Sequence, residues 1–215
     1  MRLLSGPLSM FGAKAQIAVA EKGIACEIEM VPFSIKDRYS PTHPDVARVN
    51  PKNQIPVLLD GAVEIFDSTQ IFEYLEDKFP APALWPASAE ARAFARLMEL
   101  KSDESFFPSF VVLLQTLGDP QKPETQSALA KIAAYRAEMD ALLVDRDYIA
   151  GDYSYADIAF MSASFFTSLM GGVPDPELRH LAAWRKRMMA RPAVAPVIRA
   201  LAGYLTGNGL KAPAI

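Results

Sequence analysis

The sequence predicts an α/β domain followed by an all-helical domain. The first eighty or so residues alternate between strand-like and helix-like patterns, a proline-rich stretch then interrupts the chain, and no convincing strand pattern follows it. Short apolar runs bounded by turn residues indicate strands, whereas an apolar period of about 3.6 residues indicates helices. We therefore expect an α/β domain over 1–79, a linker over 80–86 and an all-helical domain over 87–215.

The α/β domain begins with a strand, a helix and a second strand. The strand-like Arg2–Ser5 precedes a helix from about Phe11 to Lys22, and Gly23 stands where a C′ glycine ends a helix. Glu27–Val31 then alternates polar and apolar side chains, as a strand does. A polar connection over 36–44 follows. This order predicts two parallel strands joined by a helix.

The second part of the α/β domain reads as a hairpin. The apolar runs Val57–Leu59 and Val63–Phe66 flank Asp60-Gly61, a strong hairpin signal because glycine accepts the positive φ that a type I′ turn demands. Added to the parallel pair, the hairpin predicts a mixed sheet. Pro56 lacks an N–H and so belongs at the start or the edge of a strand, and the sequence leaves the isomer of the Ile55–Pro56 bond open.

Two features flank this hairpin. Before it, the backbone at Gln54–Ile55 forms an edge open to an extended peptide. After it, Asp67 or Ser68 is the N-cap of a helix with an apolar face. Two interpretations of this helix start stay open: a plain cap, or a carboxylate site, because a helix N-terminus offers free amides and a positive dipole end.

The second domain reads as helices throughout. Pro108 should kink or interrupt the first of them, because proline removes a hydrogen-bond donor. Ser154 and Asp157 have the spacing of a capping box, for which we expect a structural role. The tail from Thr206 onward should be loose. The expected helices span 88–117, 125–144, 154–170, 177–190 and 194–201.

Composition limits the classes of function. The chain has 215 residues, 51% of them hydrophobic, a formal net charge of −3 and no basic block, which argues against a nucleic-acid partner. No apolar run is long enough for a membrane span. The single cysteine, Cys26, excludes an internal disulfide and fits a cytoplasmic protein. His43 and His180 lie far apart without a cysteine cluster, so we expect no metal site.

Four segments follow one another along the chain: Asn50–Leu58 with Gln54-Ile55-Pro56-Val57, the pair Asp67-Ser68, the run Gly151–Ala159, and Leu181–Trp184 with Met188–Val194. In this order they resemble the glutathione transferase superfamily, and the resemblance covers essentially the whole chain. It implies a thioredoxin-like N-terminal domain, an all-α C-terminal domain and a homodimer. The stretch from Asp67 to Asp77 is similar to bacterial members that cleave aryl ethers.

The resemblance implies that glutathione is a co-substrate. The Ile55 backbone, ahead of Pro56, would pair with the cysteinyl unit of glutathione. Gln54, Asp67 and Ser68 would hold the γ-glutamyl end, with Asp67 placed to meet the α-amino group. The glycyl carboxylate has three candidate partners, among which spacing does not choose: Lys36, Arg38 and His43.

Ser9 is the candidate catalytic residue, because it lies at the start of the first helix, where serine-type members carry their activating hydroxyl. The alternative is a plain N-cap. Ser5 is a competing hydroxyl, which the strand should keep away from the helix start. The absence of a tyrosine before Tyr39 argues against a tyrosine-type enzyme, and Cys26 lies too far along the chain for the cysteine-type role.

The resemblance further implies a pocket for a small hydrophobic electrophile between the domains. Met10 and Phe11 would line one side, and Phe106, Phe107, Phe110 and Val111 the other. The sequence thus favours a transferase over a non-catalytic protein-interaction module of the same fold. A thiol–disulfide exchanger is disfavoured because no cysteine lies at the helix start.

Overall fold

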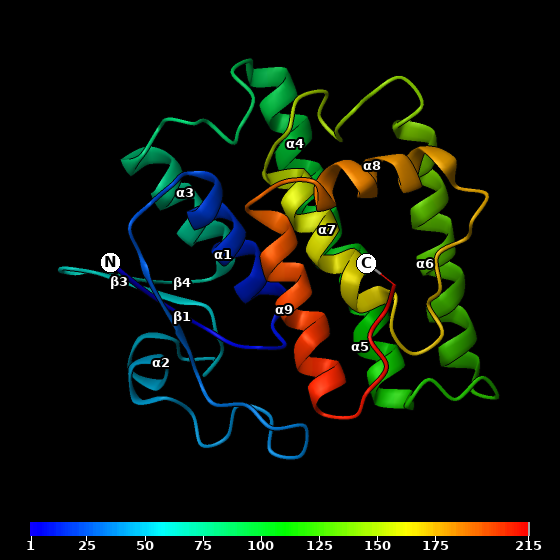
Figure 1. Ribbon diagram of the computed structural model, residues 1–215, viewed down its shortest axis with the longest axis horizontal. Coiled ribbons are helices and arrows are strands. Elements are labelled where there is room, and N and C mark those ends of the chain that lie inside the picture. The colour runs from blue at the N-terminus through cyan, green and yellow to red at the C-terminus, as the bar shows by residue number, and fades with distance from the viewer. Residues whose placement is uncertain (215) are drawn as a thin grey trace. The chain divides into compact units, whose positions relative to one another are not determined.

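The computed structural model describes residues 1–214, which fold as two compact units (Figure 1). The first unit comprises residues 1–83 and 196–210, and the second comprises residues 84–195 with 211–214. The sequence did not predict that 196–210 returns to the first unit. Among the described residues, no helix is both long and apolar enough to cross a lipid bilayer.

The first unit contains a four-stranded mixed sheet with the strand order β2-β1-β3-β4. Strand β1 (Arg2–Ser5) pairs parallel with β2 (Glu27–Met30) and antiparallel with β3 (Val57–Asp60). Strand β4 (Val63–Phe66) completes the hairpin with β3. The predicted parallel pair and antiparallel hairpin are therefore confirmed.

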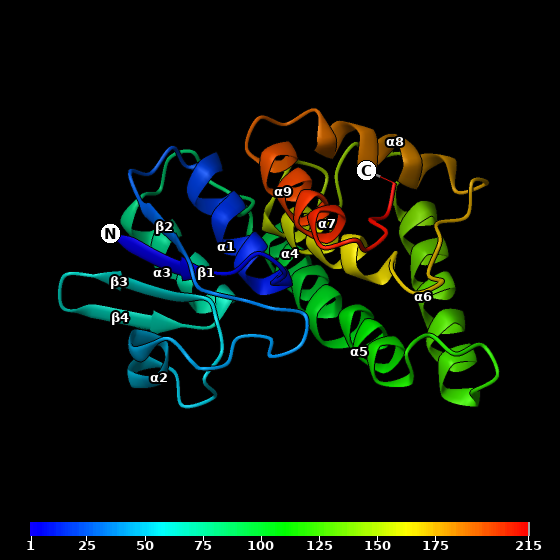
Figure 2. The ribbon, with the colours of Figure 1, turned by 60° about the horizontal axis from the view of Figure 1, so that its bottom comes forward.

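Helices cover both faces of this sheet. Consecutive residues of a strand point to opposite faces, and both Leu3 and Leu4 of β1 are fully buried. Leu3 packs with α1 (Met10–Glu21) and α3 (Ser68–Lys78), whereas Leu4 packs with α2 (Pro44–Val49). Figure 2 shows α1 and α3 on one side of the sheet and α2 on the other.

The hairpin turn differs from the expected type. The register places Asp60 opposite Val63, so the two turn residues are Gly61 and Ala62. Gly61 has a φ of +64°, but Ala62 is not among the residues with positive φ, as a type I′ turn would require. The type I′ prediction was wrong; glycine at the first central position with only that φ positive fits a type II′ turn.

The second unit is helical among its described residues, and Pro108 interrupts its first long helix as predicted. A π-helical turn, η1, immediately precedes the helix that carries Pro108 in its first turn. Helix α9 runs beyond its expected end at 201. The helices of this unit are α4 (Ala89–Lys101), η1 (Ser102–Phe106), α5 (Phe107–Thr116), α6 (Pro123–Leu142), α7 (Tyr155–Thr167) and α8 (Arg179–Met189). Helix α9 (Val194–Gly207) begins at the end of this unit, and its residues from 196 onward belong to the first unit.

Asp157 organises the core of the helical unit. The predicted capping box with Ser154 is present at the start of α7. The fully buried Asp157 carboxylate accepts hydrogen bonds from the amides of Ser154 and Ile149, each at 3.0 Å, and from the indole Nε1 of Trp184 on α8 at 2.8 Å. Burial nevertheless raises the pKa of Asp157 to about 6, because desolvation outweighs these hydrogen bonds.

Candidate active site

Three segments that carry predicted site residues leave the sheet at the same end. Leu4 near the end of β1 pairs with Val57 at the start of β3, and Val57 pairs with Phe66 at the end of β4. Because these strand ends are neighbours in the sheet, the segments that are joined to them lie close together. These segments are 6–9 after β1, 54–56 before β3, and 67–68 after β4.

Gly6 shows how closely two of these segments approach. A Cβ at Gly6 would lie 2.6 Å from Cδ1 of Ile55 and 2.5 Å from the hydroxyl oxygen of Tyr39. Real Cβ atoms essentially never approach other atoms so closely, so only glycine lets the loop lie against Ile55 here. No local sequence pattern indicates that Tyr39 joins this region, because a contact made in the folded chain brings it there.

Ser9 is the N-cap of α1. Its backbone is extended, and its Oγ accepts a hydrogen bond of 2.9 Å from the amide of Gly12. The residue is 8% exposed. Accepting one hydrogen bond leaves the hydroxyl its own proton to donate, and the donor at its oxygen polarises the O–H bond. Capping and donation by Ser9 are therefore compatible.

Ser5 lies nearer the helix start than expected. A Cβ at Gly12, in the first turn of α1, would collide with Oγ of Ser5, so the expectation that the strand keeps Ser5 away was wrong. However, Ser5 is fully buried and its Oγ accepts a hydrogen bond of 2.7 Å from Gln16. Of the two hydroxyls, Ser9 is the one with access to solvent.

The loop before β3 is held by Asn50, a buried residue whose role the sequence did not reveal. Its Nδ2 donates to the Gln54 carbonyl at 2.6 Å, and its Oδ1 accepts from the Lys52 amide at 2.9 Å. Gln54 is exposed, and the Ile55–Pro56 peptide is cis. Among the described residues, the Ile55 backbone makes no hydrogen bond to another backbone group.

Asp67 is the N-cap of α3, which resolves the choice between Asp67 and Ser68. Its Oδ1 accepts from the amides of Thr69 at 3.0 Å and Gln70 at 3.2 Å. Asp67 is exposed and has a φ of +76°, which is uncommon outside glycine. Ser68, in contrast, is the first helical residue and is buried. A left-handed residue at a loop end is the kind of local strain that is found at binding sites.

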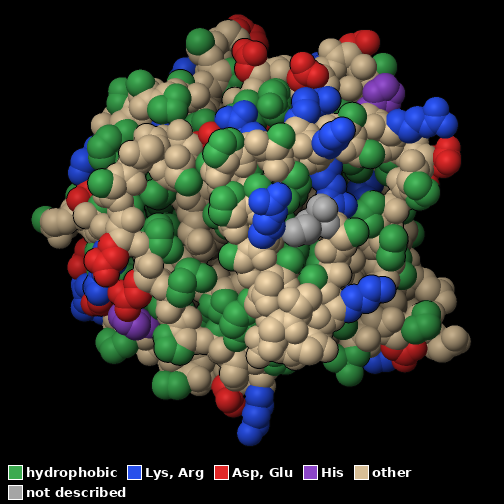
Figure 3. All heavy atoms as spheres, in the orientation of Figure 1, with side chains coloured by type: hydrophobic (Ala, Val, Ile, Leu, Met, Phe, Trp, Pro, Cys, Tyr) green, Lys and Arg blue, Asp and Glu red, His purple; other side chains and the backbone are tan. Residues whose placement is uncertain are grey.

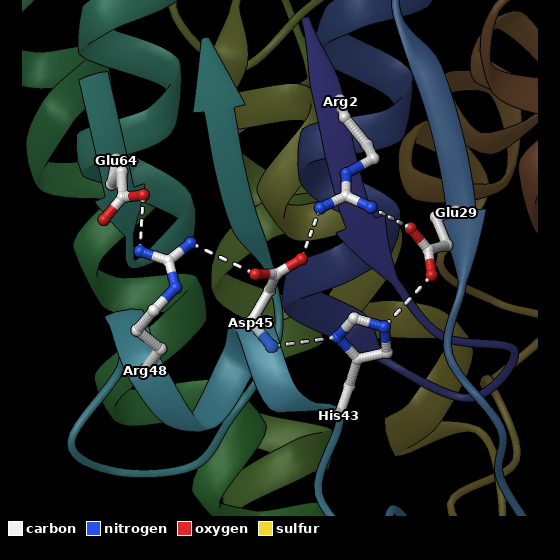
Figure 4. Close-up of polar contacts among 6 residues, drawn as sticks. All are labelled: Arg2, Glu29, His43, Asp45, Arg48 and Glu64. Atoms are coloured by element: carbon white, nitrogen blue, oxygen red, sulfur yellow. Dashed lines mark hydrogen bonds and ion pairs between the residues drawn. The ribbon is translucent and has the colours of Figure 1, made fainter. Parts of the chain in front are cut away.

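His43 belongs to an ion-pair network on the α2 side of the sheet (Figure 4). It caps α2, with Nδ1 accepting from the Asp45 amide at 3.2 Å and Nε2 lying 3.1 Å from Glu29. Arg2 and Arg48 both bind Asp45, and the hydrogen bond from Arg48 is the main cause that lowers the pKa of that carboxyl. Both ring nitrogens of His43 therefore have partners within the protein.

Lys36 and Arg38 lie in a turn of the loop between β2 and α2. The Ser34 amide donates to the Arg38 carbonyl at 3.0 Å and the Arg38 amide donates to the Ser34 carbonyl at 2.8 Å, which closes the turn. Both basic residues are exposed. Of the three basic candidates, these two remain open to a ligand.

The residues expected to line an electrophile pocket differ in exposure. In the first unit, Met10 is buried and Phe11 is half-buried. In the second unit, Phe106 is only 1% exposed and its ring stacks on Tyr135 at 4.8 Å, so Phe106 is part of the helical core. The remaining candidates lie nearer the surface: Phe107, half-buried, Phe110, 9% exposed, and Val111, 37% exposed.

Cys26 does not have the properties of an activated thiol. Cys26 immediately precedes β2, and burial raises the pKa of its thiol, the reverse of what an activated cysteine needs. Within residues 1–214, no three His, Cys, Asp or Glu side chains gather closely enough to hold a metal ion.

Comparison with known proteins gives the family. The glutathione S-transferase N-terminal domain family matches residues 3–83, and the glutathione S-transferase C-terminal domain family matches residues 88–192. A stringent starvation protein A homolog from Coxiella burnetii is 30% identical over 71% of this chain and 68% of its own length. Four relatives of that description are matched over 48% to 68% of their length.

Two further proteins resemble a larger part of the chain. A probable glutathione S-transferase parC from Nicotiana tabacum is 30% identical over 87% of this chain and 84% of its own. The crystal structure of a theta class glutathione S-transferase from Xanthomonas axonopodis pv. citri, with glutathione bound, is 26% identical and covers 92% of this chain and 96% of its own, with a TM-score of 0.76. The thioredoxin-like sheet, the helical unit and both domain matches lead to one conclusion: the chain belongs to the glutathione S-transferase superfamily.

Proposed function

We propose that the protein is a glutathione transferase, in which a bound and stabilised glutathione thiolate attacks a small hydrophobic electrophile. The observation that carries the proposal is the convergence of the segments of Ser9, Ile55 and Asp67 at one end of the sheet. Membership of the superfamily supports it, as does the relative with glutathione bound.

Glutathione would bind as an extended peptide along the start of β3. The Ile55 backbone, which makes no backbone hydrogen bond among the described residues, would pair with the cysteinyl unit by strand addition. The Asp67 carboxylate would meet the α-amino group, while the amides at the start of α3, with Ser68 and Gln54, would hold the γ-glutamyl carboxylate. Since His43 has protein partners at both nitrogens, Lys36 and Arg38 are left for the glycyl carboxylate.

Ser9 would stabilise the thiolate. A free thiol titrates near ~8.5, so lowering its pKa by about two units requires roughly 2.7 kcal/mol. One hydrogen bond to a charged group contributes about 1.5–3 kcal/mol, and a helix N-terminus adds about 0.3–1 kcal/mol. The Ser9 hydroxyl, polarised by the Gly12 amide, would supply the hydrogen bond, and the N-terminus of α1 would supply the second contribution.

The candidate residues for contact with the electrophile all carry apolar side chains. Met10 and Phe11 follow Ser9 directly, and Phe107, Phe110 and Val111 are the remaining candidates from α5, since Phe106 lies in the core. An apolar set of this kind favours hydrophobic substrates. Ether cleavage, dehalogenation and isomerisation are variants of the same thiolate chemistry.

We further propose that the protein is a cytoplasmic homodimer. Leu97 and Leu100 on α4 are 52% and 53% exposed, and three residues of separation places them on one face of the helix. Exposed apolar residues that share a face are typical of protein–protein contacts. Sedimentation of the purified chain should therefore give twice the monomer mass.

A second candidate function is a non-catalytic protein-interaction module. The similarity to stringent starvation protein A homologs favours it, because those proteins are similar to this chain over part of its length and their description names no transferase activity. A module of this kind has no need of a thiolate, so its Ser9 would act as a helix cap alone. The two functions therefore differ in what Ser9 does.

The test compares two variants that each lose one N-cap hydroxyl. Ser9→Ala removes the cap of α1, and Ser88→Ala removes the matched cap of α4, whose Oγ accepts from Ala91 at 3.2 Å. We expect Ser9→Ala to lower kcat for conjugation of an aryl halide by roughly 10–100-fold, with the calorimetric Kd for glutathione changed by less than about threefold (below ~0.7 kcal/mol).

Ser88→Ala should leave kcat unchanged. Loss of kcat in both variants would assign the effect to fold stability, and unchanged kcat in Ser9→Ala would remove Ser9 from the mechanism. Absence of glutathione binding by the wild type at millimolar concentration would contradict the transferase proposal and favour the interaction module.

A further inference from the structure

The helical unit buries an arginine for which the described residues supply no acidic partner. Arg136 on α6 is 3% exposed. Its guanidinium donates to the Gly172 carbonyl at 2.8 Å, to Ser168 Oγ at 2.9 Å and to Thr167 Oγ1 at 3.3 Å, and it lies 5.9 Å from the Phe106 ring. All of these partners are uncharged.

A second arginine lies close to the first. Arg185 on α8 is half-buried, and its hydrogen bond goes to the carbonyl of Ala214. Burial, and secondly the charge of Arg185, lowers the pKa of Arg136 to about 10; burial also lowers the pKa of Arg185. Both shifts mean that the surroundings penalise the two positive charges.

Among the described residues, no carboxylate lies within ion-pair distance of either guanidinium. A buried charge is strongly destabilising unless an opposite charge accompanies it. Asp175 borders the same cavity, but its Oδ1 accepts from the Glu177 amide, and it makes no ion pair with either arginine. The two arginines therefore bring two positive charges together, as an anion-binding site does, and no described residue supplies the negative charge.

The two arginines border one cavity, which has a volume of about 190 Å³. Its wall is mainly apolar, with Leu181 and the buried Trp184 on α8, and it includes the hydroxyl-bearing Ser164 and Ser168 on the α7 side. The volume equals the space of about six liquid water molecules. Two guanidinium groups and nearby hydroxyls can bind a carboxylate or phosphate, and the apolar wall can contact an apolar body attached to it.

The surroundings of the cavity would attract such a ligand. Helix α8 carries Arg179, Arg185, Lys186 and Arg187 and no acidic residue. Arg179 pairs with Glu177 and Arg187 with Asp147, so the excess positive charge comes from Arg185 and Lys186. In Figure 3, Lys and Arg side chains gather over the part of the face where Figure 1 shows α8. A local excess of one charge steers oppositely charged ligands toward a site.

We propose that this cavity binds a small organic anion, with its carboxylate or phosphate headgroup between Arg136 and Arg185 and its apolar body against Leu181 and Trp184. The site lies wholly within the helical unit and shares no residue with the candidate glutathione site. It neither requires nor excludes transferase activity.

Tryptophan fluorescence offers a direct measurement, because Trp184 borders the cavity and the chain has only one other tryptophan, Trp85. The probes are benzoate, phenyl phosphate and the neutral benzyl alcohol. We expect saturable quenching by at least one of the two anions, and the stronger of them identifies the headgroup. Benzyl alcohol should bind at least about tenfold more weakly, as loss of a charged hydrogen bond implies.

The matched variants are Arg185→Gln and Lys186→Gln, which remove the same charge from consecutive positions of α8; Lys186 is exposed and does not border the cavity. Arg185→Gln should weaken anion binding about tenfold or more, and Lys186→Gln should not. Circular dichroism confirms that both variants fold. Calorimetry should show unchanged glutathione affinity in both.

Three results would overturn the proposal: no saturable quenching by either anion, equal binding of benzyl alcohol, or an equal loss of binding in Lys186→Gln. The last would show that the general positive charge of α8, and not a built site, attracts the anion. Failure of glutathione to bind in the separate calorimetric experiment would count against the transferase proposal alone.

Discussion

At the scale of single residues, one serine oxygen combines structure and chemistry. Ser9 Oγ satisfies the Gly12 amide, a donor that the first turn of α1 would otherwise leave unpaired. The same hydrogen bond polarises the O–H bond of Ser9, which makes the hydroxyl a stronger donor to a thiolate. Helix capping is thus compatible with the catalytic role proposed for this residue, and the two roles are separated only by measuring chemistry and stability together.

Asp157 yields a prediction about pH. Burial raises its folded-state pKa to about 6, whereas an unfolded aspartate titrates near ~3.9. The folded state therefore holds this proton more tightly, so the carboxyl contributes most to stability below about pH 4 and loses that contribution as the pH rises through about 6.

Asp157→Asn cannot titrate and serves as the reference. We expect the unfolding free energy of the wild type minus that of the variant to fall by about 2 kcal/mol between about pH 4 and pH 7. Urea unfolding of both proteins across this range measures the difference. A difference that stays constant or grows with pH would contradict the raised pKa.

At the scale of elements, substitutions at the start of α3 can distinguish the capping role of Asp67 from the role of its negative charge. Asn at position 67 retains a side-chain oxygen for the Thr69 and Gln70 amides and tolerates positive φ, but it lacks the negative charge. We expect Asp67→Asn to leave the unfolding free energy within about 0.5 kcal/mol of the wild type. Its calorimetric Kd for glutathione should rise about tenfold or more, because a charged hydrogen bond to the α-amino group is lost.

Asp67→Ala is the comparison, since it loses the cap as well as the charge. It should lower the unfolding free energy by about 1 kcal/mol in addition to weakening glutathione binding. Unchanged glutathione affinity in both variants would show that Asp67 is a helix cap and no more.

The sequence predicted those elements that local signals determine. The strands of the mixed sheet, the helix after Asp67, the Ser154–Asp157 capping box and the break at Pro108 all follow from neighbouring residues. It missed α2, because that helix spans Pro44–Val49 and buries only Val46, too little for an apolar period to show. It also assigned a type I′ turn where Ala62 keeps a negative φ.

The residues of the candidate site also divide into those that local sequence signals predict and those that only the folded chain reveals. Ser9 and Asp67 were predictable as helix caps because the cap signal is local, although their proposed roles came from resemblance. The contacts of Asn50 and Tyr39 and the burial of Phe106 depend on what the folded chain places beside them. No local pattern contains that information.

At the scale of the whole molecule, the C-terminal segment 196–210 supports the first unit. The Tyr204 hydroxyl on α9 donates to the Phe33 carbonyl at 2.8 Å, and their rings lie 5.8 Å apart. Phe33 in turn contacts Tyr39 at 4.6 Å, and Tyr39 lies beside Gly6. A helix from the end of the chain thereby holds a loop that borders the candidate glutathione site.

Tyr204→Phe removes the hydroxyl and keeps the ring. We expect the unfolding free energy to fall by about 1 kcal/mol, and the amides of the loop over 33–39 to exchange hydrogen faster. Asn208→Ala is the control, since its side chain donates to the Tyr204 carbonyl and not to the loop. Equal loop exchange in both variants and the wild type would show that the hydroxyl does not hold the loop.

The central claim is that the end of the sheet stabilises a glutathione thiolate, and the most direct measurement is the pKa of the bound thiol. Titration of thiolate absorbance should place it about two units below the ~8.5 of a free thiol in the wild-type complex. Ser9→Ala should return it most of the way toward that value while glutathione still binds. A wild-type complex whose thiol titrates as it does in free solution would contradict the account.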